Sequence, residues 1–238
     1  MEEIKKLQEN RENQIILETK NLLIDTLKEE DIEEAVECVS TSFAERELMS
    51  IVLGISKKEW DPLTIQIVEL GVKCGLSVVA REKQTNKFVG CFLSQDVFDD
   101  SKIEFSKLCS KWEPLWAILD EFNKHKENIK KGEYLHLWTI SVNEEFKGKK
   151  FANSISYANL ILGAQNKFKY GISEATAPGS QAAFRKLGFE EKDYIKYSSY
   201  KYKEKYPFEF LEGGVSFVMK PLQNILKETK TKKTLFLN

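Results

Sequence analysis

The sequence predicts an α/β protein in which a central mixed, mostly antiparallel sheet carries helices on both faces. Two observations lead to this prediction. Short apolar runs alternate with amphipathic stretches along the chain, and the expected strands and helices alternate instead of falling into separate blocks. Hydrophobic residues make up 42% and charged residues 31% of the 238 residues, which suits a globular chain with a sizeable core.

The bulk composition argues against several classes of partner. The 36 basic and 37 acidic residues give a net charge of -1, so the chain as a whole offers no electrostatic case for nucleic-acid binding. No run approaches the roughly 18 apolar residues of a membrane span, and the polar start does not resemble a secretory signal. We therefore expect a cytoplasmic or nuclear protein with no membrane partner. We also expect a monomer or a homodimer.

The four cysteines are far apart and form no C-x-x-C pair, which predicts neither a metal site nor a disulfide framework. They are Cys38, Cys74, Cys91 and Cys109. No internal repeat and no Gly/Ser linker interrupts the chain. We predict a polar N-terminal extension over residues 1–21, a single domain over residues 22–222 and a basic C-terminal tail over residues 223–238.

The first half of the domain begins with a strand over Leu22–Leu27. The acidic residues of Glu29–Asp31 suit the first turn of the amphipathic helix that follows. A second helical region contains Pro62, which we interpret as a first-turn residue, and ends near Gly75. Residues 76–81 and 87–94 are apolar runs on either side of a turn-like segment, and this pattern predicts a hairpin.

The second half continues the alternation. The segment from Val97 to Gly132 is longer than an ordinary loop, and its apolar spacing predicts a helix between Trp112 and Phe122. In chain order we then expect a strand over Tyr134–Val142, a helix from Lys149 to about Phe168, a strand over Tyr170–Thr176, a short helix over Ser180–Leu187 closed by Gly188, and paired strands over Ile195–Tyr202 and Val215–Met219.

The turn after Val142 is the most informative segment of the sequence. A strand, a glycine-containing basic turn and a long helix together present unpaired backbone N–H groups and a positive helix end to a phosphate. Lys147, Lys149 and Lys150 add local positive charge. The alternative interpretation is an ordinary solvated connection between a strand and a helix.

The segment V-N-E-E-F-K-G-K-K-F-A, from Val142 to Ala152, resembles the fingerprint of the GNAT superfamily, a strand followed by Q/R-x-x-G-x-G/A and a helix. Lys147 takes the first position and Ala152 the last, while Lys150 replaces the central glycine. The resemblance implies the GNAT-like acyl-CoA N-acyltransferase fold, acetyl-CoA as cofactor, and cofactor contacts from Ile140, Ser141, Val142, Lys147, Gly148, Lys149, Lys150, Phe151, Ala152, Ser180 and Phe184.

A second segment, from Ala175 to Phe189, resembles the short helix that lies beside the cofactor in this superfamily and ends in Y-x-x-x-G-F. Gly188 and Phe189 match the end of this element. Phe184 takes the place of the tyrosine that often protonates the departing CoA thiolate. A thiol with a pKa of about 8.5 leaves acceptably as the thiolate, so the reaction tolerates this change.

A third segment narrows the resemblance to the arylalkylamine N-acetyltransferase-like branch seen in insects. That branch carries F-x-x-E-P-[LM]-[NT], and its glutamate is the general base. Glu47 takes the glutamate position, and Leu48 replaces the proline. The resemblance implies acetylation of a primary amine, which is mostly protonated near neutral pH and must lose a proton before its nitrogen attacks the thioester.

His136 is a competing candidate for the base. Alternation along its strand predicts that Tyr134, His136, Trp138 and Ile140 share one face. The vertebrate arylalkylamine branch has two histidines one residue apart on this strand; His136 matches the first, and Trp138 occupies the second position. A lone strand histidine is also common as a structural residue, so both bases stay open.

Other features leave the acceptor open. A backbone N–H near Ile140 to Val142 is expected to polarise the thioester carbonyl. Trp112, Trp116, Trp138 and the tyrosines between Tyr194 and Tyr202 are either pocket residues or core. A protein or peptide acceptor needs an open groove instead of a closed pocket, and the long inserted helix argues against such a groove. A small-molecule amine is therefore favoured. A catalytically degenerate acyl-CoA-binding module, with Lys150 and Phe184 as signs of decay, is the third alternative.

Overall fold

The computed structural model describes residues 15–103 and 110–231. The first 14 residues of the predicted extension, the last seven of the predicted tail, and Cys109 lie outside this part. Within these ranges there are eight strands: β1 (Leu17–Glu18), β2 (Leu22–Thr26), β3 (Val78–Glu82), β4 (Phe88–Asp96), β5 (Tyr134–Val142), β6 (Tyr170–Ala175), β7 (Glu190–Lys196) and β8 (Gly214–Pro221). The helices are α2 (Ile32–Arg46), α3 (Leu48–Leu53), α4 (Lys57–Cys74), α5 (Glu113–Asp120), α6 (Phe151–Gln165), α7 (Pro178–Lys186) and α8 (Ile225–Thr231).

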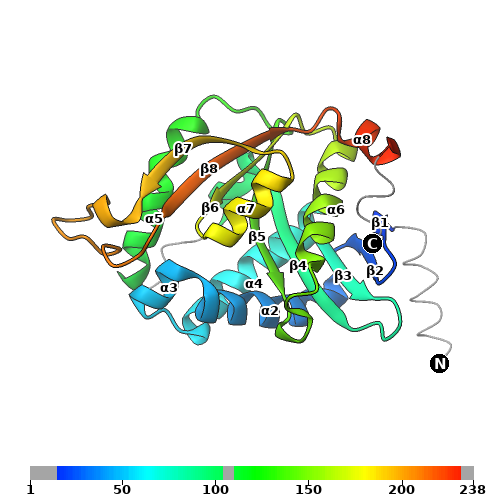
Figure 1. The fold of residues 1–238 in the computed structure, drawn as a ribbon, viewed down its shortest axis with the longest axis horizontal. Coiled ribbons are helices and arrows are strands. Elements are labelled where there is room, and N and C mark those ends of the chain that lie inside the picture. The colour runs from blue at the N-terminus through cyan, green and yellow to red at the C-terminus, as the bar shows by residue number, and fades with distance from the viewer. Residues whose placement is uncertain (1–14, 104–109, 232–238) are drawn as a thin grey trace.

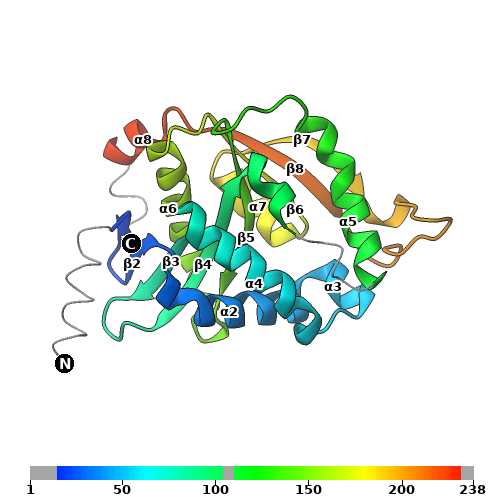
Figure 2. The ribbon, with the colours of Figure 1, turned by 180° about the vertical axis from the view of Figure 1, so that it is seen from behind.

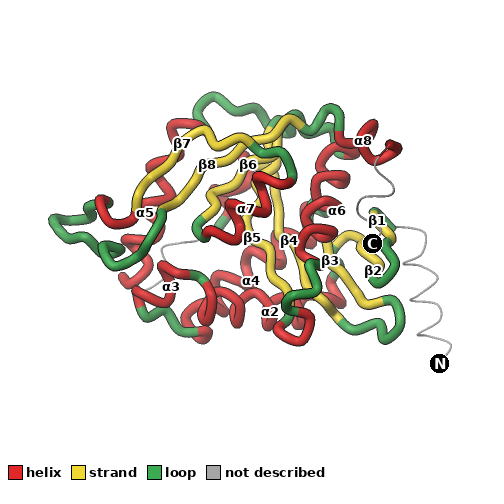
Figure 3. Tube along the Cα trace, in the orientation of Figure 1, coloured by secondary structure: helices red, strands yellow, loops and turns green. Residues whose placement is uncertain are grey.

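The strands form one sheet in the order β1-β2-β3-β4-β5-β6-β8-β7 (Figure 1). Neighbouring strands are antiparallel except for β5 and β6, which run parallel. Figure 3 shows the strands as a continuous yellow layer with red helices on either side. The prediction of a mixed, mostly antiparallel sheet covered on both faces is confirmed.

Each face of the sheet has its own core. Helices α6 and α7 lie on the face toward the viewer in Figure 1, and α2 and α4 lie on the opposite face, seen in front in Figure 2. Strand β3 shows how the alternation serves both faces, because Val79 packs with the α2 and α4 side while Val78 and Ala80 pack with α6. The period-two apolar pattern thus builds two cores from one strand.

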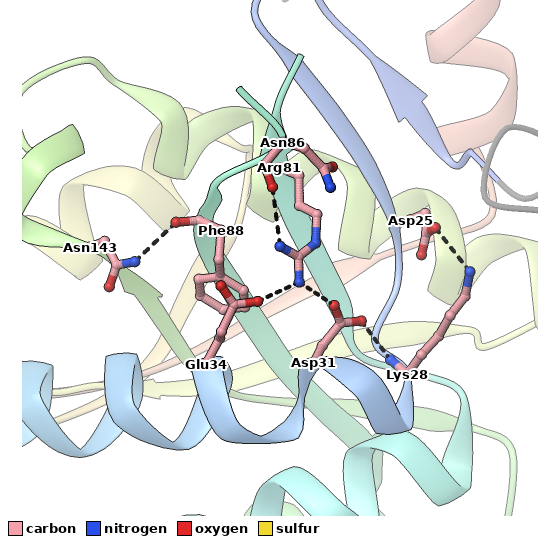
Figure 4. Close-up of polar contacts among 8 residues, drawn as sticks. All are labelled: Asp25, Lys28, Asp31, Glu34, Arg81, Asn86, Phe88 and Asn143. Atoms are coloured by element: carbon pink, nitrogen blue, oxygen red, sulfur yellow. Dashed lines mark hydrogen bonds and ion pairs between the residues drawn. The ribbon is translucent and has the colours of Figure 1, made fainter. Parts of the chain in front are cut away.

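The start of α2 is fixed to the hairpin by a partly buried ion cluster (Figure 4). The Arg81 guanidinium on β3 donates to Asp31 at 2.6 Å and to Glu34 at 2.5 Å, and also to the Asn86 carbonyl at 3.2 Å. The Asp31 side chain is fully buried, whereas Glu34 is half exposed. The acidic first turn therefore places a carboxylate where the arginine compensates its burial.

Two expectations about helices need correction or addition. Pro62 is the sixth residue of α4 and therefore not a first-turn residue. The helix begins at Lys57, directly after its N-cap residue Ser56. Gly75 closes this helix in the left-handed conformation, with φ of 64°, as the sequence predicts. Sequence periodicity missed the six-residue helix α3 altogether, since it is shorter than two full turns.

The predicted strand over Ile195–Tyr202 is wrong in its boundaries. The strand β7 covers Glu190–Lys196, and Tyr197 to Ser199 form a short 3₁₀ helix. Strand β7 is at the edge of the sheet, and its charged side chains are mostly exposed. An edge strand of this kind needs no apolar alternation, so the charged residues of Glu190–Lys196 gave no strand pattern in the sequence.

Regular structure extends beyond both predicted limits of the domain. Strand β1 pairs with β2 before residue 22. Helix α8 follows residue 222, buries Ile225 and contacts α6, where the Tyr157 and Thr229 hydroxyls are 3.1 Å apart. The division into extension, domain and tail stays a prediction. Among the described residues, no helix is long and apolar enough to cross a membrane.

Candidate functional site

Strands β5 and β6 separate along their length. They pair only where Tyr134–His136 faces Tyr170–Ile172. At the end of this ladder the Ser173 hydroxyl donates to the Leu137 carbonyl at 2.8 Å. From Trp138 onward, no described strand pairs with β5 on this side, although β4 remains paired on the other. The separation leaves backbone groups of β5 open toward a gap.

The gap contains a cavity of about 150 Å³, which we call the strand-gap cavity. It is lined by Ser42, Phe43, Arg46, Glu47, Phe92, Leu137, Trp138, Thr139, Ile140, Ser173, Glu174, Ala175, Thr176, Ala177, Ser180 and Phe184. Four residues predicted from the sequence therefore meet here, namely Glu47, Ile140, Ser180 and Phe184. Phe184 is buried against Phe189, with ring centroids 4.8 Å apart.

A β-bulge in β5 changes which side chains face this gap. Leu93 of β4 pairs with Thr139, whereas the next residue pairs with Leu137, so Trp138 has no opposite partner. Beyond the bulge, each side chain of β5 faces the side of the sheet opposite to the one that strict alternation predicts. Trp138 packs with the core on the α2 side and Ile140 with the core on the α6 side, so the prediction that the two share a face is wrong.

A larger cavity, of about 400 Å³, adjoins the first on the side of α2, α4 and α5. We call it the helix-side cavity. Its wall consists of Val39, Phe43, Glu47, Met49, Trp60, Thr64, Ile67, Leu115, Trp116, Leu119, Asp120, Asn123, Lys126, His136, Trp138, Thr139, Glu174 and Thr176. Half of these side chains are apolar or aromatic, and the charged residues among the others are Glu47, Asp120, Lys126 and Glu174.

The two cavities share part of their walls. Phe43, Glu47, Trp138, Thr139, Glu174 and Thr176 line both. Among the described residues, the buried Thr139 hydroxyl has no hydrogen-bond partner. Two molecules, one in each cavity, would therefore meet beside a carboxylate and an unsatisfied hydroxyl.

Glu47 connects α2 to α3 and caps the second helix. Its carboxylate accepts hydrogen bonds from the Met49 N–H at 3.2 Å, from the Ser50 N–H at 2.6 Å and from the Ser50 hydroxyl at 2.7 Å. The side chain is 9% exposed. A carboxylate has about four acceptor sites, so three donors fix Glu47 at the cavity wall and leave acceptor capacity.

His136 belongs to a buried ionic group in the wall of the helix-side cavity. Its Nε2 is 2.7 Å from Glu174 Oε2, and the Lys126 ammonium is 2.7 Å from Oε1 of the same carboxylate. Burial opposes ionisation of Glu174, but the neighbouring His136 and Lys126 outweigh burial and hold the pKa of this carboxyl well below its usual range. Glu174 is therefore a charged residue in the wall of both cavities.

The turn from Lys147 to Ala152 lies beyond the end of β5 and lines neither cavity. Gly148 and Lys150 both have positive φ, at 79° and 61°. Lys150 precedes α6 in the left-handed conformation, and its side chain makes no capping hydrogen bond to the first N–H groups of this helix. The position that carries glycine in the fingerprint thus adopts a backbone conformation that favours glycine.

Replacing Lys150 by glycine is expected to raise the free energy of unfolding by about 1 kcal/mol, because glycine adopts positive φ without steric cost. Lys149→Gly is the matched control, since Lys149 does not have positive φ, and it should not stabilise the protein. Urea denaturation of both variants measures the difference. Equal free energies of unfolding of the two variants would contradict the claim that the backbone at Lys150 is strained.

The aromatic residues divide between wall and core. Trp60, Trp116 and Trp138 line the helix-side cavity, whereas Trp112 lies behind Trp60 with ring centroids 4.2 Å apart. The tyrosines between 194 and 202 line neither cavity. Tyr197, for example, is fully buried and donates its hydroxyl proton to the Thr176 carbonyl at 2.6 Å.

Sequence reasoning missed four site residues: Arg46, Trp60, Lys126 and Glu174. They lie on four separate segments and share no spacing, so no local pattern identified them. Of the predicted residues, Ser141 and Val142 lie at the end of β5 without lining either cavity, and the Ser141 hydroxyl is buried without a partner among the described residues.

No protein-family model matches the chain, and no curated protein matches it in sequence. Solved structures do resemble it. The C-terminal condensation domain of Ebony, in complex with beta-alanyl-dopamine, has a TM-score of 0.77 at 15% identity, covering 84% of this chain and 98% of that one. Arylalkylamine N-acetyltransferase 2 from Aedes aegypti has a TM-score of 0.69 at 16% identity, covering 85% and 100%. Mosquito arylalkylamine N-acetyltransferase like 5b has a TM-score of 0.65 at 15% identity, covering 84% of this chain and 99% of that one. The chain has the fold of the GNAT acetyltransferases, as the sequence resemblance implies.

Proposed function

We propose that this protein transfers an acetyl group from acetyl-CoA to a small-molecule primary amine. The observation that carries the proposal is the meeting of two cavities at Glu47, Thr139 and Glu174. A two-substrate reaction requires adjoining sites for donor and acceptor, and proximity of the reacting groups supplies much of the catalysis. We assign the strand-gap cavity to the acyl end of the donor and the helix-side cavity to the amine.

The chain offers suitable groups for the cofactor. The open side of β5 resembles a strand edge, at which the pantetheine amides find backbone partners near Ile140 to Val142. Beyond it, the uncapped N-terminus of α6 and the lysines of the preceding turn suit a diphosphate. Acetyl-CoA would supply the activated acyl group as a thioester. Ser180 and Phe184, on the other wall of the gap, would contact the arm of the cofactor.

Glu47 is the proposed general base, with His136 as the alternative. Glu47 lines both cavities, whereas His136 lines only the helix-side cavity and is bonded to Glu174. A base must reach the nitrogen that attacks the thioester, directly or through one water, so the residue at the junction is better placed. A backbone N–H of β5 would polarise the thioester carbonyl. Phe184 offers no proton, so the thiolate departs unassisted by that residue.

The helix-side cavity favours a small amine over a protein. Residues of α5 and of the segment after it form one of its walls, and a volume of about 400 Å³ suits a compact molecule. The apolar and aromatic lining fits an acceptor with an apolar body. The names of the similar structures, which refer to arylalkylamines and to beta-alanyl-dopamine, support the same class.

The test is a panel of primary amines with acetyl-CoA, followed by thiol release. Calorimetry or thermal shift with acetyl-CoA first establishes binding, and absence of binding at millimolar cofactor contradicts the proposal. Binding without turnover of any amine favours an acyl-CoA-binding module. Turnover of peptide N-termini alone favours a protein acetyltransferase.

A further inference from the structure

We propose that Arg46 binds the diphosphate of the cofactor, and that Glu144 occupies this anion site in the free protein. Cofactor binding then exchanges a carboxylate for a diphosphate, and Glu144 lowers the affinity for CoA. The inference rests on the proposed function, because it assigns the turn after β5 to the cofactor.

Arg46 is the last residue of α2, and its side chain lines the strand-gap cavity. Its Nη2 donates to the carbonyl of Val142, 96 residues away, at 3.2 Å. Its Nη1 is 3.5 Å from Glu144 Oε2. Its Nε is buried and has no hydrogen-bond partner among the described residues. The guanidinium therefore lies between the cavity and the turn, with unused donor capacity.

Glu144 contacts two cations at once. Its Oε1 is 2.8 Å from the ammonium of Lys147, while its Oε2 faces Arg46. The Lys147 hydrogen bond, with a smaller contribution from the Arg46 charge, lowers the pKa of the Glu144 carboxyl. The carboxylate is thus an anion held between the two positive groups nearest the start of the turn.

These ion pairs are exchangeable. Glu144 and Lys147 are 63% and 64% exposed, and exposed ion pairs contribute little stability. A diphosphate carries more charge and accepts bidentate hydrogen bonds from a guanidinium, so it competes well for both cations. The N–H groups at the start of α6 add donors that the Glu144 carboxylate does not use.

The neighbouring Glu145 provides a matched control. Its Oε2 is 2.8 Å from the ammonium of Lys87, on the hairpin between β3 and β4. Among the described residues, Glu145 forms no ion pair with Arg46 or Lys147. Glu145→Gln changes the net charge of the turn by the same amount as Glu144→Gln. The comparison therefore separates competition for the anion site from a general change of charge.

The experiment is isothermal titration calorimetry of the full chain with CoA, dephospho-CoA, and pantetheine, which has no diphosphate. Glu144→Gln should tighten CoA binding about threefold, and Glu145→Gln should change it less. Arg46→Gln should weaken CoA binding about tenfold, with partial recovery in Arg46→Lys. Both effects should persist with dephospho-CoA and disappear with pantetheine. Circular dichroism establishes that each variant is folded.

Three results would overturn the inference. The first is an unchanged CoA affinity in Arg46→Gln. The second is equal affinity in Glu144→Gln and Glu145→Gln. The third is loss of both effects with dephospho-CoA, which assigns the contact to the 3′-phosphate. If the wild type binds CoA and the variants do not differ, the inference fails and the proposed function stands. If the wild type does not bind CoA, the proposed function fails.

Discussion

Replacement of Glu47 by glutamine is expected to lower kcat/KM for amine acetylation by about 100-fold to 1000-fold, within the usual range for a general base. Glutamine keeps the size of the side chain and one acceptor for the cap of α3, but it cannot take a proton from the ammonium. Because the variant can acetylate only amine that is already deprotonated, its kcat/KM should rise as the pH approaches the pKa of the free amine. Steady-state kinetics with saturating acetyl-CoA measures both quantities.

A control separates catalysis from the cap. The Ser50 hydroxyl donates to the Glu47 carboxylate at 2.7 Å, so Ser50→Ala weakens the cap while it leaves the base in place. This variant should lose some stability and keep most of its activity. The assignment is wrong if Glu47→Gln retains the kcat/KM of the wild type while His136→Ala lowers it by about 100-fold or more.

Glu174→Gln is expected to lower the free energy of unfolding by about 3 kcal/mol at pH 7, because it removes the buried carboxylate charge that Lys126 and His136 share. Glu133→Gln is the matched control, since Glu133 pairs with Lys169 at 2.9 Å on an exposed surface. Its effect should be much smaller. Chemical denaturation at several pH values measures both variants.

The pH dependence of this difference has a definite sign. The folded protein holds the pKa of Glu174 below its ordinary value, so the unfolded chain binds the proton more tightly. The stabilisation is complete above the unfolded pKa of about 4.3 and decreases as the pH falls toward the folded pKa. The difference between wild type and Glu174→Gln should therefore shrink below about pH 4.3. A difference that is small at pH 7, or that grows on acidification, contradicts the role of this ionic group.

The sequence predicted the parts of the fold that follow from local patterns. The strand Tyr134–Val142 was predicted with its observed boundaries, because alternating apolar residues and the basic glycine turn mark its two ends. The helix after this turn was also expected, although it begins at Phe151. Periodicity gave no sign of the bulge at Trp138, since a bulge depends on the register of the neighbouring strand.

The site was predictable only where it coincided with a motif. Glu47, Ile140, Ser180 and Phe184 were found through family resemblance, and the structure brings them to one cavity. Glu174 was not found, because its partners come from distant segments and carboxylates are common on strands. Its role depends on burial between two cavities, which only tertiary packing creates.

The most direct test of the account is turnover of small primary amines by the purified full chain with acetyl-CoA, with thiol release measured and the product identified by mass spectrometry. We expect an acetylated amine formed in equal amount with free CoA, and loss of both in Glu47→Gln. CoA-thiol release that does not depend on any amine, or no binding of acetyl-CoA at millimolar concentration, would contradict it.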